Sequence, residues 1–167
     1  MARQTIELAM CVRDESLGLR QAIESARRAG VDSVLVWDTG SVDGTLEIAQ
    51  SIADRIYKLQ VPDEAMDFGE MKTILAHLSR GDWTLVLDGD EMIQSLVDLH
   101  DLINDPRYGV WRMPRYRWAD LEMTTQLEIE AFPDWQYRLF RNDGLSHYVE
   151  PLHERFVTPH NIGDCDV

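Results

Sequence analysis

The stretch Trp83-Thr-Leu-Val-Leu-Asp-Gly-Asp-Glu91 joins a short apolar run to a group of carboxylates. Residues 84–87 carry no charge, which is typical of a strand buried on both faces of a sheet. Carboxylates this close together repel one another, and a hard divalent cation relieves that repulsion at the end of a parallel strand. We expect Gly89 to permit the tight turn between them. The stretch therefore predicts a cation site, with an acidic turn that caps the next helix as the alternative.

Strand and helix patterns alternate through the first ninety or so residues of the chain. Apolar runs indicate strands over residues 6–12, where Glu7 is the exception, over 33–37 and over 84–87. A short third strand is expected over residues 55–59, and helical spacing of apolar residues separates the four strands. This alternation predicts a parallel sheet with helices on both faces. Right-handed crossovers put the carboxyl ends of these strands on one edge. We therefore expect the acidic residues that follow the strands to share one crevice, namely Asp14, Asp38, Asp43, Asp88 and Asp90.

The second half of the chain has a different pattern. Ser16 and Asp43 are expected to cap helices of the first half. Beyond the central stretch we expect a helix, a strand or hairpin, a strand and a last strand region, over residues 93–103, 108–118, 135–140 and 147–157. A polar, frayed tail is expected from Thr158. The predicted fold class is α/β: a Rossmann-like, mainly parallel sheet with helices on both faces and a smaller mixed β region in the C-terminal half.

Composition excludes several classes of protein. With 44% hydrophobic and 28% charged residues, the 167-residue chain is typical of one globular domain and not of a disordered chain. The formal net charge of −14 disfavours stable binding to nucleic acid or to anionic membranes. A local basic track remains possible in one segment, at Arg112, Arg115 and Arg117.

Cysteine content and hydropathy bear on the cellular compartment. Cys11 and Cys165 are the only cysteines, and their spacing indicates neither a disulfide framework nor a metal knot. No apolar run approaches the ~20 residues of a membrane span, and the first strand begins too early for a signal peptide. A soluble, cytoplasmic protein without a transmembrane segment is expected.

Several segments taken together resemble a family 2 glycosyltransferase of the GT-A fold. They are R-D-E at 13–15, V-W-D-T-G-S-V-D-G-T at 36–45, D-F-G-E-M-K at 67–72, G-D-W-T-L-V-L-D-G-D-E at 81–91, W-Q-Y-R-L-F-R-N at 135–142 and L-H-E-R at 152–155. The resemblance covers residues 6–157. It implies transfer of a sugar from a nucleotide-sugar donor, commonly UDP-linked, with Mn²⁺ or Mg²⁺ and with inversion at the anomeric carbon. It also implies a nucleotide-sugar half (1–91), an acceptor and catalytic half (92–157) and a tail (158–167).

The resemblance assigns donor contacts to particular residues. Asp38 would accept a hydrogen bond from the imide N–H of uracil, in a pocket lined by Val12 and Arg13. Lys72 stands where the family often has arginine, so it keeps a cation for the diphosphate but lacks bidentate geometry. Asp43 more often shapes its loop in such a motif, and this structural role is the interpretation we favour.

The resemblance also assigns the metal contacts. Asp90 would bind the metal directly, and Asp88 would hold the ribose or a metal-bound water. His153 would complete the metal shell, although a structural hydrogen bond is the alternative for a lone histidine. A metal at this place stabilises the charge that accumulates on the departing diphosphate.

The general base has several candidates. Inversion needs a carboxylate opposite the leaving group, and Asp134 stands where related enzymes place it. Glu154, Glu128 and Glu130 are its rivals. Arg138 and Arg141 would support the diphosphate or buttress the base. Sugar rings could stack on tryptophans that could equally pack in the core, namely Trp111, Trp118 and Trp135.

The predicted function is therefore a metal-dependent, inverting glycosyltransferase. Its acceptor could be a saccharide, a lipid-linked sugar, a peptide or a modified nucleic-acid base. One alternative is a nucleotide-sugar binding module or a nucleotidyltransferase-like enzyme, although residues 13–16 lack the glycine-rich, basic loop that the latter needs. A purely acidic interaction domain is the other alternative, and it predicts no dependence on metal.

Overall fold

A seven-stranded sheet forms the centre of the protein. The computed structural model describes residues 3–94, 97–118, 126–127, 134–151 and 154–165. The sheet order is β11 (Ile162–Asp164), β5 (Val110–Arg115), β8 (Asp134–Arg141), β4 (Trp83–Val86), β1 (Ile6–Val12), β2 (Ser33–Asp38) and β3 (Arg55–Lys58). β1 to β4 are mutually parallel, and β8 runs antiparallel between β4 and β5. The predicted α/β class with a mainly parallel sheet is confirmed.

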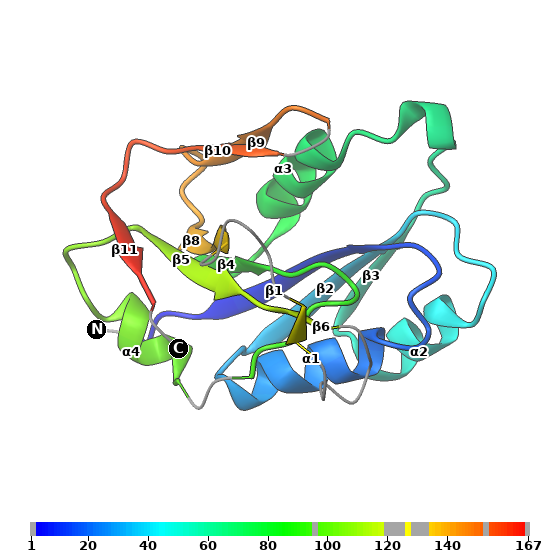
Figure 1. Ribbon diagram of the computed structural model, residues 1–167, viewed down its shortest axis with the longest axis horizontal. Helices are drawn as coiled ribbons and strands as arrows, with labels where there is room; N and C mark the ends of the chain where they lie inside the picture. Colours follow the sequence, from blue (N-terminus) through cyan, green and yellow to red (C-terminus); the bar gives the residue numbers. More distant parts are fainter. Residues whose placement is uncertain (1–2, 95–96, 119–125, 128–133, 152–153, 166–167) are drawn as a thin grey trace.

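Helices cover both faces of this sheet (Figure 1). α1 (Leu19–Arg28), α2 (Thr45–Ile52) and the short α4 (Leu99–Ile103) lie on one face. The other face carries α3 (Phe68–Leu78) and a separate two-stranded sheet of β9 (His147–Val149) and β10 (Arg155–Val157). A 3₁₀ turn, η1 (Asp63–Ala65), precedes α3, and β6 (Arg117–Trp118) pairs with β7 (Gln126–Leu127). In the part of the chain that is described, no helix has the length and apolar character of a membrane span.

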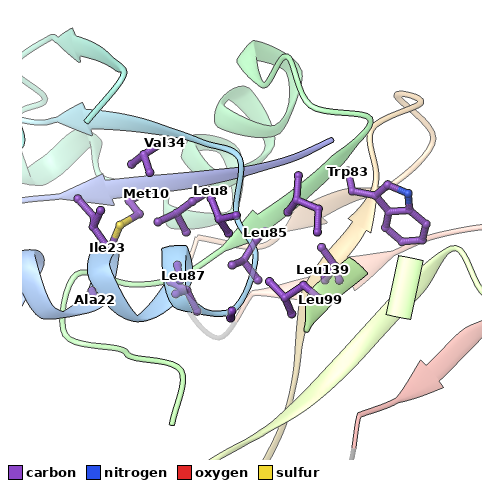
Figure 2. Packing of buried hydrophobic residues seen from close by; sticks show 14 of the residues in the cluster. Leu8, Met10, Ala22, Ile23, Val34, Trp83, Leu85, Leu87, Leu99 and Leu139 are labelled. Atoms are coloured by element: carbon purple, nitrogen blue, oxygen red, sulfur yellow. The ribbon is translucent and has the colours of Figure 1, made fainter. Parts of the chain in front are cut away.

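The main core lies between the sheet and α1 (Figure 2). Leu8 and Met10 of β1 are fully buried there, together with Ile23 of α1 and Leu85 of β4. The opposite face of β1 is buried by α3, where Ala9 is equally inaccessible. A mostly apolar sequence therefore suits this central strand, because neither of its faces meets water, and its one charged residue, Glu7, is buried in an ion pair with Arg55.

Two expectations about the C-terminal half are wrong. The helix expected over residues 93–103 is only α4, because the Asp98 side chain accepts a hydrogen bond from His100 N and starts the helix there. Within the described tail, residues 159–165, the chain is not frayed, because β11 pairs in parallel with β5. Gly163 makes this pairing possible, since a Cβ there would lie 2.6 Å from the Trp111 ring.

Both expected helix caps are wrong, and the N-cap of α2 is Gly44 and not Asp43. The N-cap of α1 is Gly18 and not Ser16. Ser16 N instead donates to Asp43 Oδ2 at 3.0 Å, while Asp43 Oδ1 accepts from Thr45 N. Asp43 therefore joins the loops after β1 and β2, which is the loop-shaping role that we favoured. These hydrogen bonds hold the pKa of Asp43 below its ordinary value.

One residue of β8 faces no partner in β5. Trp111 pairs with Leu139, whereas the next residue, Arg112, pairs with Tyr137. Arg138 is therefore the extra residue of a β-bulge. Bulges redirect side chains next to functional sites, and Arg138 reaches the acidic turn that follows β4.

Candidate active site

The turn after β4 presents carboxylates with different surroundings. Its backbone is closed by a hydrogen bond from Glu91 N to Asp88 O of 3.1 Å, and Asp88 N donates to Glu91 Oε2 at 3.1 Å. The Asp88 side chain is 37% exposed, while that of Glu91 is 15% exposed. Asp90 lies at the surface. The turn therefore places one carboxylate in water and holds the other two against protein.

Asp88 is held by a cation at each carboxylate oxygen. Lys72 Nζ lies 3.0 Å from Oδ1, and Arg138 Nη2 lies 3.4 Å from Oδ2. Burial opposes ionisation of Asp88, but the charges of Arg138 and Lys72 outweigh it and keep its pKa below the ordinary value. Asp88 is therefore a fixed, ionised acceptor at neutral pH.

The same cations belong to a larger network of ion pairs in which positive and negative side chains alternate. Arg138 also pairs with Glu91, and Arg115 lies 3.6 Å from Glu91 Oε1 and 2.6 Å from Asp134 Oδ2. Burial raises the pKa of Glu91 although Arg138 opposes this shift. The successive members of this ion-pair network are Glu154, Lys72, Asp88, Arg138, Glu91, Arg115 and Asp134. Two of the predicted candidates for the general base, Glu154 and Asp134, thus stand at its ends, each held by a cation.

Asp90 is the carboxylate of this edge that stays available to a ligand. Its side chain is exposed, and within the described ranges no hydrogen bond or ion pair engages it. The described residues contain no group of three His, Cys, Asp or Glu side chains that could hold a metal ion. His153, the predicted third partner, lies outside the described residues. Asp90 nevertheless fits a hard cation, because its unpaired oxygens are the donors that Mn²⁺ and Mg²⁺ prefer.

A second site feature lies at the end of β2. Asp38 is fully buried, and its Oδ1 accepts hydrogen bonds from Gly40 N at 2.9 Å and Ser41 N at 3.0 Å. Its Oδ2 is buried without a hydrogen-bond partner among the residues that the structure describes. A buried acceptor left unpaired is costly, so this atom requires a donor from a buried water or from an N–H group of a ligand.

Cys11 lies in β1, beside the strand that carries Asp38, and Arg13 follows directly after β1. Arg13 donates to Thr39 Oγ1 at 3.1 Å and to Thr39 O at 2.8 Å, and it also contacts Val61 O and Asp63. It therefore ties the loop after β3 to the ends of β1 and β2. Burial raises the pKa of Cys11 to about 12, so its thiol stays protonated at neutral pH and is no nucleophile. Val12, the other predicted lining residue, is 2% exposed and pairs with Asp38.

Comparison with known proteins decides the family. The model of the family described as glycosyl transferase family 2 matches residues 8–161, which is most of the chain. The chain belongs to glycosyl transferase family 2. A TPR repeat-containing protein of Synechococcus elongatus is 31% identical to this glycosyltransferase over 155 residues, which are 92% of this chain and 36% of that protein. The chain thus spans about a third of the length of that relative (36%).

Solved structures show the same fold. Residues 1–349 of TarS of S. aureus, in complex with UDP, superpose with a TM-score of 0.60 at 13% identity, and the match covers 96% of this chain and 60% of that 1–349 chain. The mannosyltransferase PcManGT from Pyrobaculum calidifontis, in complex with GDP-Man and Mn²⁺, gives 0.56 at 14% identity over 70% and 37%. Glucosyl-3-phosphoglycerate synthase from Mycobacterium tuberculosis in complex with UDP gives 0.52 at 21% identity over 68% and 45%. The glycosyltransferase therefore has the GT-A fold.

One residue lies at the acidic turn that the sequence did not predict to be there. Glu15 packs directly on Gly89, where a Cβ would lie 2.5 Å from Glu15 Cγ. Gly89 does not have a positive φ, so the turn itself does not need glycine, contrary to our expectation. It is the close approach of Glu15 that excludes a side chain. Burial, reinforced by Asp90 and Asp88, raises the pKa of Glu15. The R-D-E segment was the available signal, but it did not single out Glu15.

Replacing Gly89 with alanine is therefore expected to displace the acidic turn. Overpacking of this kind costs about 1–3 kcal/mol, and a misplaced turn should lower kcat/KM at least ~10-fold. Thermal unfolding and donor turnover measure the two effects. Adding Glu15→Ala to Gly89→Ala should restore part of the lost stability, because it removes Glu15 Cγ and Cδ from the contact. Unchanged stability in the single variant would contradict the contact.

The remaining residues that were predicted for the site lie in different parts of the fold. Trp111 is 7% exposed in the main core. Trp135 is partly buried, with the Arg112 guanidinium 5.5 Å from its ring centroid. Arg141 lies over the Trp83 ring and not at the acidic turn. Glu128 and Glu130 lie outside the described residues, as does the side chain of Trp118.

The basic segment at Arg112, Arg115 and Arg117 is largely neutralised by ion pairs with acidic side chains. Arg112 pairs with Asp164 at 2.8 Å, and Arg115 pairs with Asp134. Arg117 is exposed on β6. Two of the three arginines are therefore engaged in ion pairs, which weakens the case for a track that binds nucleic acid.

Proposed function

We propose that this protein transfers a sugar from a nucleotide-sugar, most simply a UDP-sugar, to an acceptor nucleophile. The observation that carries the proposal is the buried, unpaired Oδ2 of Asp38, on a strand that shares one sheet edge with the Asp88–Asp90 turn. β1 lies between the two strands, so both carboxylates follow parallel strands that end on the same side. A base and a diphosphate joined by one ribose suit this arrangement.

The donor's base is recognised by the hydrogen-bond polarity of Asp38. An ionised carboxylate only accepts, so it pairs with the imide N–H of uracil or with N1–H of guanine. Cytosine presents an acceptor at the corresponding position and would face it unfavourably. Val12 and Arg13 frame this pocket in the proposal. Structures with a similar fold contain UDP in TarS and GDP-Man in PcManGT, which supports a base of the first kind.

Replacing one carboxylate oxygen of Asp38 with an NH₂ group should therefore change which nucleotide base the protein prefers. In wild-type protein with Mn²⁺, UDP is expected to bind at least ~10-fold more tightly than CDP, since an unpaired polar contact costs about 1–3 kcal/mol. Asp38→Asn keeps an oxygen for Gly40 N and Ser41 N and turns an NH₂ group toward the ligand, so the preference should reverse toward CDP. Isothermal titration of both nucleotides tests this. An Asp38→Asn variant that prefers UDP over CDP by the same factor as wild type would contradict the assignment of Asp38 as the contact to the base.

We further propose that transfer depends on Mn²⁺ or Mg²⁺ held through Asp90, with His153 as the predicted additional ligand. When bound, the ion neutralises the charge that collects on the leaving diphosphate. Asp88, fixed by Lys72 and Arg138, would accept from the ribose hydroxyls or from water on the ion. Arg138 would add positive charge beside the diphosphate. Mn²⁺ in the complex of PcManGT supports a divalent cation in this fold.

Inversion requires a base on the acceptor side, and we propose Asp134 or Glu154 for this role. Asp134 accepts hydrogen bonds from Arg115 at 2.6 Å and from Gln136 at 2.7 Å, which orient its carboxylate. Glu154 is oriented by Lys72. Asp134→Asn and Glu154→Gln, made separately, identify the base: the correct variant loses turnover and keeps its affinity for UDP.

The acceptor is proposed to be a saccharide, a lipid-linked sugar or a peptide. A nucleic-acid base is disfavoured by the net charge of −14 and by the ion pairs of Arg112 and Arg115. A cytoplasmic location is proposed as well, and both cysteines are free thiols, as is usual in a reducing compartment.

A further inference from the structure

The ammonium group of Lys72 lies between carboxylates from two separate sheets. Its Nζ is 3.0 Å from Asp88 Oδ1 and 3.0 Å from Glu154 Oε1. Asp88 follows β4 of the seven-stranded sheet, whereas Glu154 precedes β10 of the two-stranded sheet. The Lys72 side chain is only 8% exposed, so little water screens either ion pair. Lys72 therefore links two parts of the edge that share no strand pairing.

The two carboxylates depend on Lys72 to different extents. Asp88 has a second cation, because Arg138 Nη2 lies 3.4 Å from its other oxygen. For Glu154, Lys72 is the single ion-pair or hydrogen-bond partner found among the described residues. Loss of the ammonium would thus leave Asp88 with an ion pair and Glu154 without one, with only the more distant charge of Arg138 still acting on Glu154.

α3, which carries Lys72, is anchored without it. Thr73 Oγ1 donates to Tyr148 O at 3.0 Å and accepts from Tyr148 N at 2.9 Å, which binds the helix to β9. Gly69 packs against the backbone at Glu150 so closely that no Cβ fits. The helix is therefore a fixed support, and the Lys72 side chain extends from it to the two carboxylates.

We infer that Lys72 is a positioning residue that holds Glu154 at a fixed place relative to Asp88. Its charge is balanced by two carboxylates, so it is not the diphosphate contact that the resemblance suggests. The inference rests on the proposed function, with Glu154 rather than Asp134 as the base on the acceptor side. It extends the site from the donor side, at Asp88, to the two-stranded sheet.

Lys72→Met tests the inference through the split between kcat and donor affinity. Because Asp88 keeps Arg138, the Kd for UDP with Mn²⁺ should stay within ~3-fold of wild type. The kcat should fall by ~10²-fold or more, about as far as in Glu154→Gln, since a misplaced catalytic carboxylate loses most of its contribution. The double variant should be no slower than the slower single variant, because both changes disable one unit. Lys72→Arg should recover part of kcat by keeping the charge.

The chain offers a matched control in its only other lysine. Lys58 is exposed on the edge strand β3. Lys58→Met should keep the wild-type kcat and Kd. A Lys72→Met enzyme with wild-type kcat would overturn the inference, and so would a loss of UDP affinity of ~10-fold or more with kcat unchanged.

Thermal unfolding gives an answer that needs no substrate. Lys72→Met should lower the Tm by ~5–10 °C in the wild-type background, because it strands a partly buried carboxylate. In the Glu154→Gln background the decrease should be half of that or less. Equal decreases in both backgrounds would overturn the inference. A wild-type protein that binds no UDP would end the proposed function instead, so the two failures are distinguishable.

Discussion

Asp90→Ala is expected to abolish metal-dependent turnover while leaving the fold intact. The Asp90 side chain is exposed and engages no partner in the described part of the chain, so its loss removes no contact that stabilises the protein. If it holds the cation that neutralises the leaving diphosphate, kcat/KM should fall by ~10³-fold or more. Binding of UDP should lose its dependence on Mn²⁺. Titrations with and without the ion, together with donor turnover, measure these changes.

The stability of this variant separates a ligand-binding role from a structural one. Asp90→Ala should keep the wild-type Tm or raise it slightly, because the neighbouring carboxylates of Glu15 and Asp88 then repel one less charge. Asp101→Ala, at an exposed position of α4, is the matched control and should leave both Tm and turnover unchanged. Persisting Mn²⁺-dependent turnover in Asp90→Ala would refute the assignment.

Glu7→Ala is expected to produce the largest loss of stability. Glu7 is 1% exposed in β1, and its carboxylate accepts from Ser33 of β2, from Arg55 of β3 and from Arg80 N after α3. Arg55 Nη2 lies 2.6 Å away, and its side chain is 18% exposed. Removing one partner of a buried ion pair leaves the other charge uncompensated, so the free energy of unfolding should fall by about 3–5 kcal/mol.

Chemical denaturation measures this loss, and two further variants interpret it. Glu7→Gln keeps an acceptor and should fall between wild type and Glu7→Ala. Glu24→Ala removes an exposed carboxylate 3.9 Å from Arg20 on α1 and should cost at most about 0.5 kcal/mol. A Glu7→Ala protein as stable as the Glu24→Ala control would show that the buried ion pair contributes nothing net.

β1, β2 and β4 were predictable because they are buried on both faces. Val34, Leu35 and Val36 form an uninterrupted run, and the structure buries all three completely. The α4 and β11 errors have another origin. The apolar spacing over residues 93–103 fits a helix locally, but Ile93 N instead donates to Ser25 Oγ of α1. Tertiary contacts of this kind leave no periodic signal in a sequence.

The acidic turn of the candidate site was predictable from the sequence, but the side chains that contact this turn were not. Asp38, Asp88 and Asp90 follow strands, so parallel topology alone brings them to one edge. The alternating ion pairs depend on Arg138, whose direction is set by a bulge that pattern analysis does not detect. Glu15 was missed for a similar reason, since only the three-dimensional packing shows it against Gly89.

The extra residue in β8 restricts how the length of this strand can change. Deleting Arg138 would keep Leu139 opposite Trp111 and Tyr137 opposite Arg112, but it would remove the guanidinium that contacts Asp88 and Glu91. A further residue inserted beside it would shift part of β8 by one position and invert the facing of the shifted side chains, because side chains alternate along a strand. Insertions and deletions among natural or engineered homologues should therefore avoid β8. Grafted acceptor-binding loops should be joined outside residues 134–141.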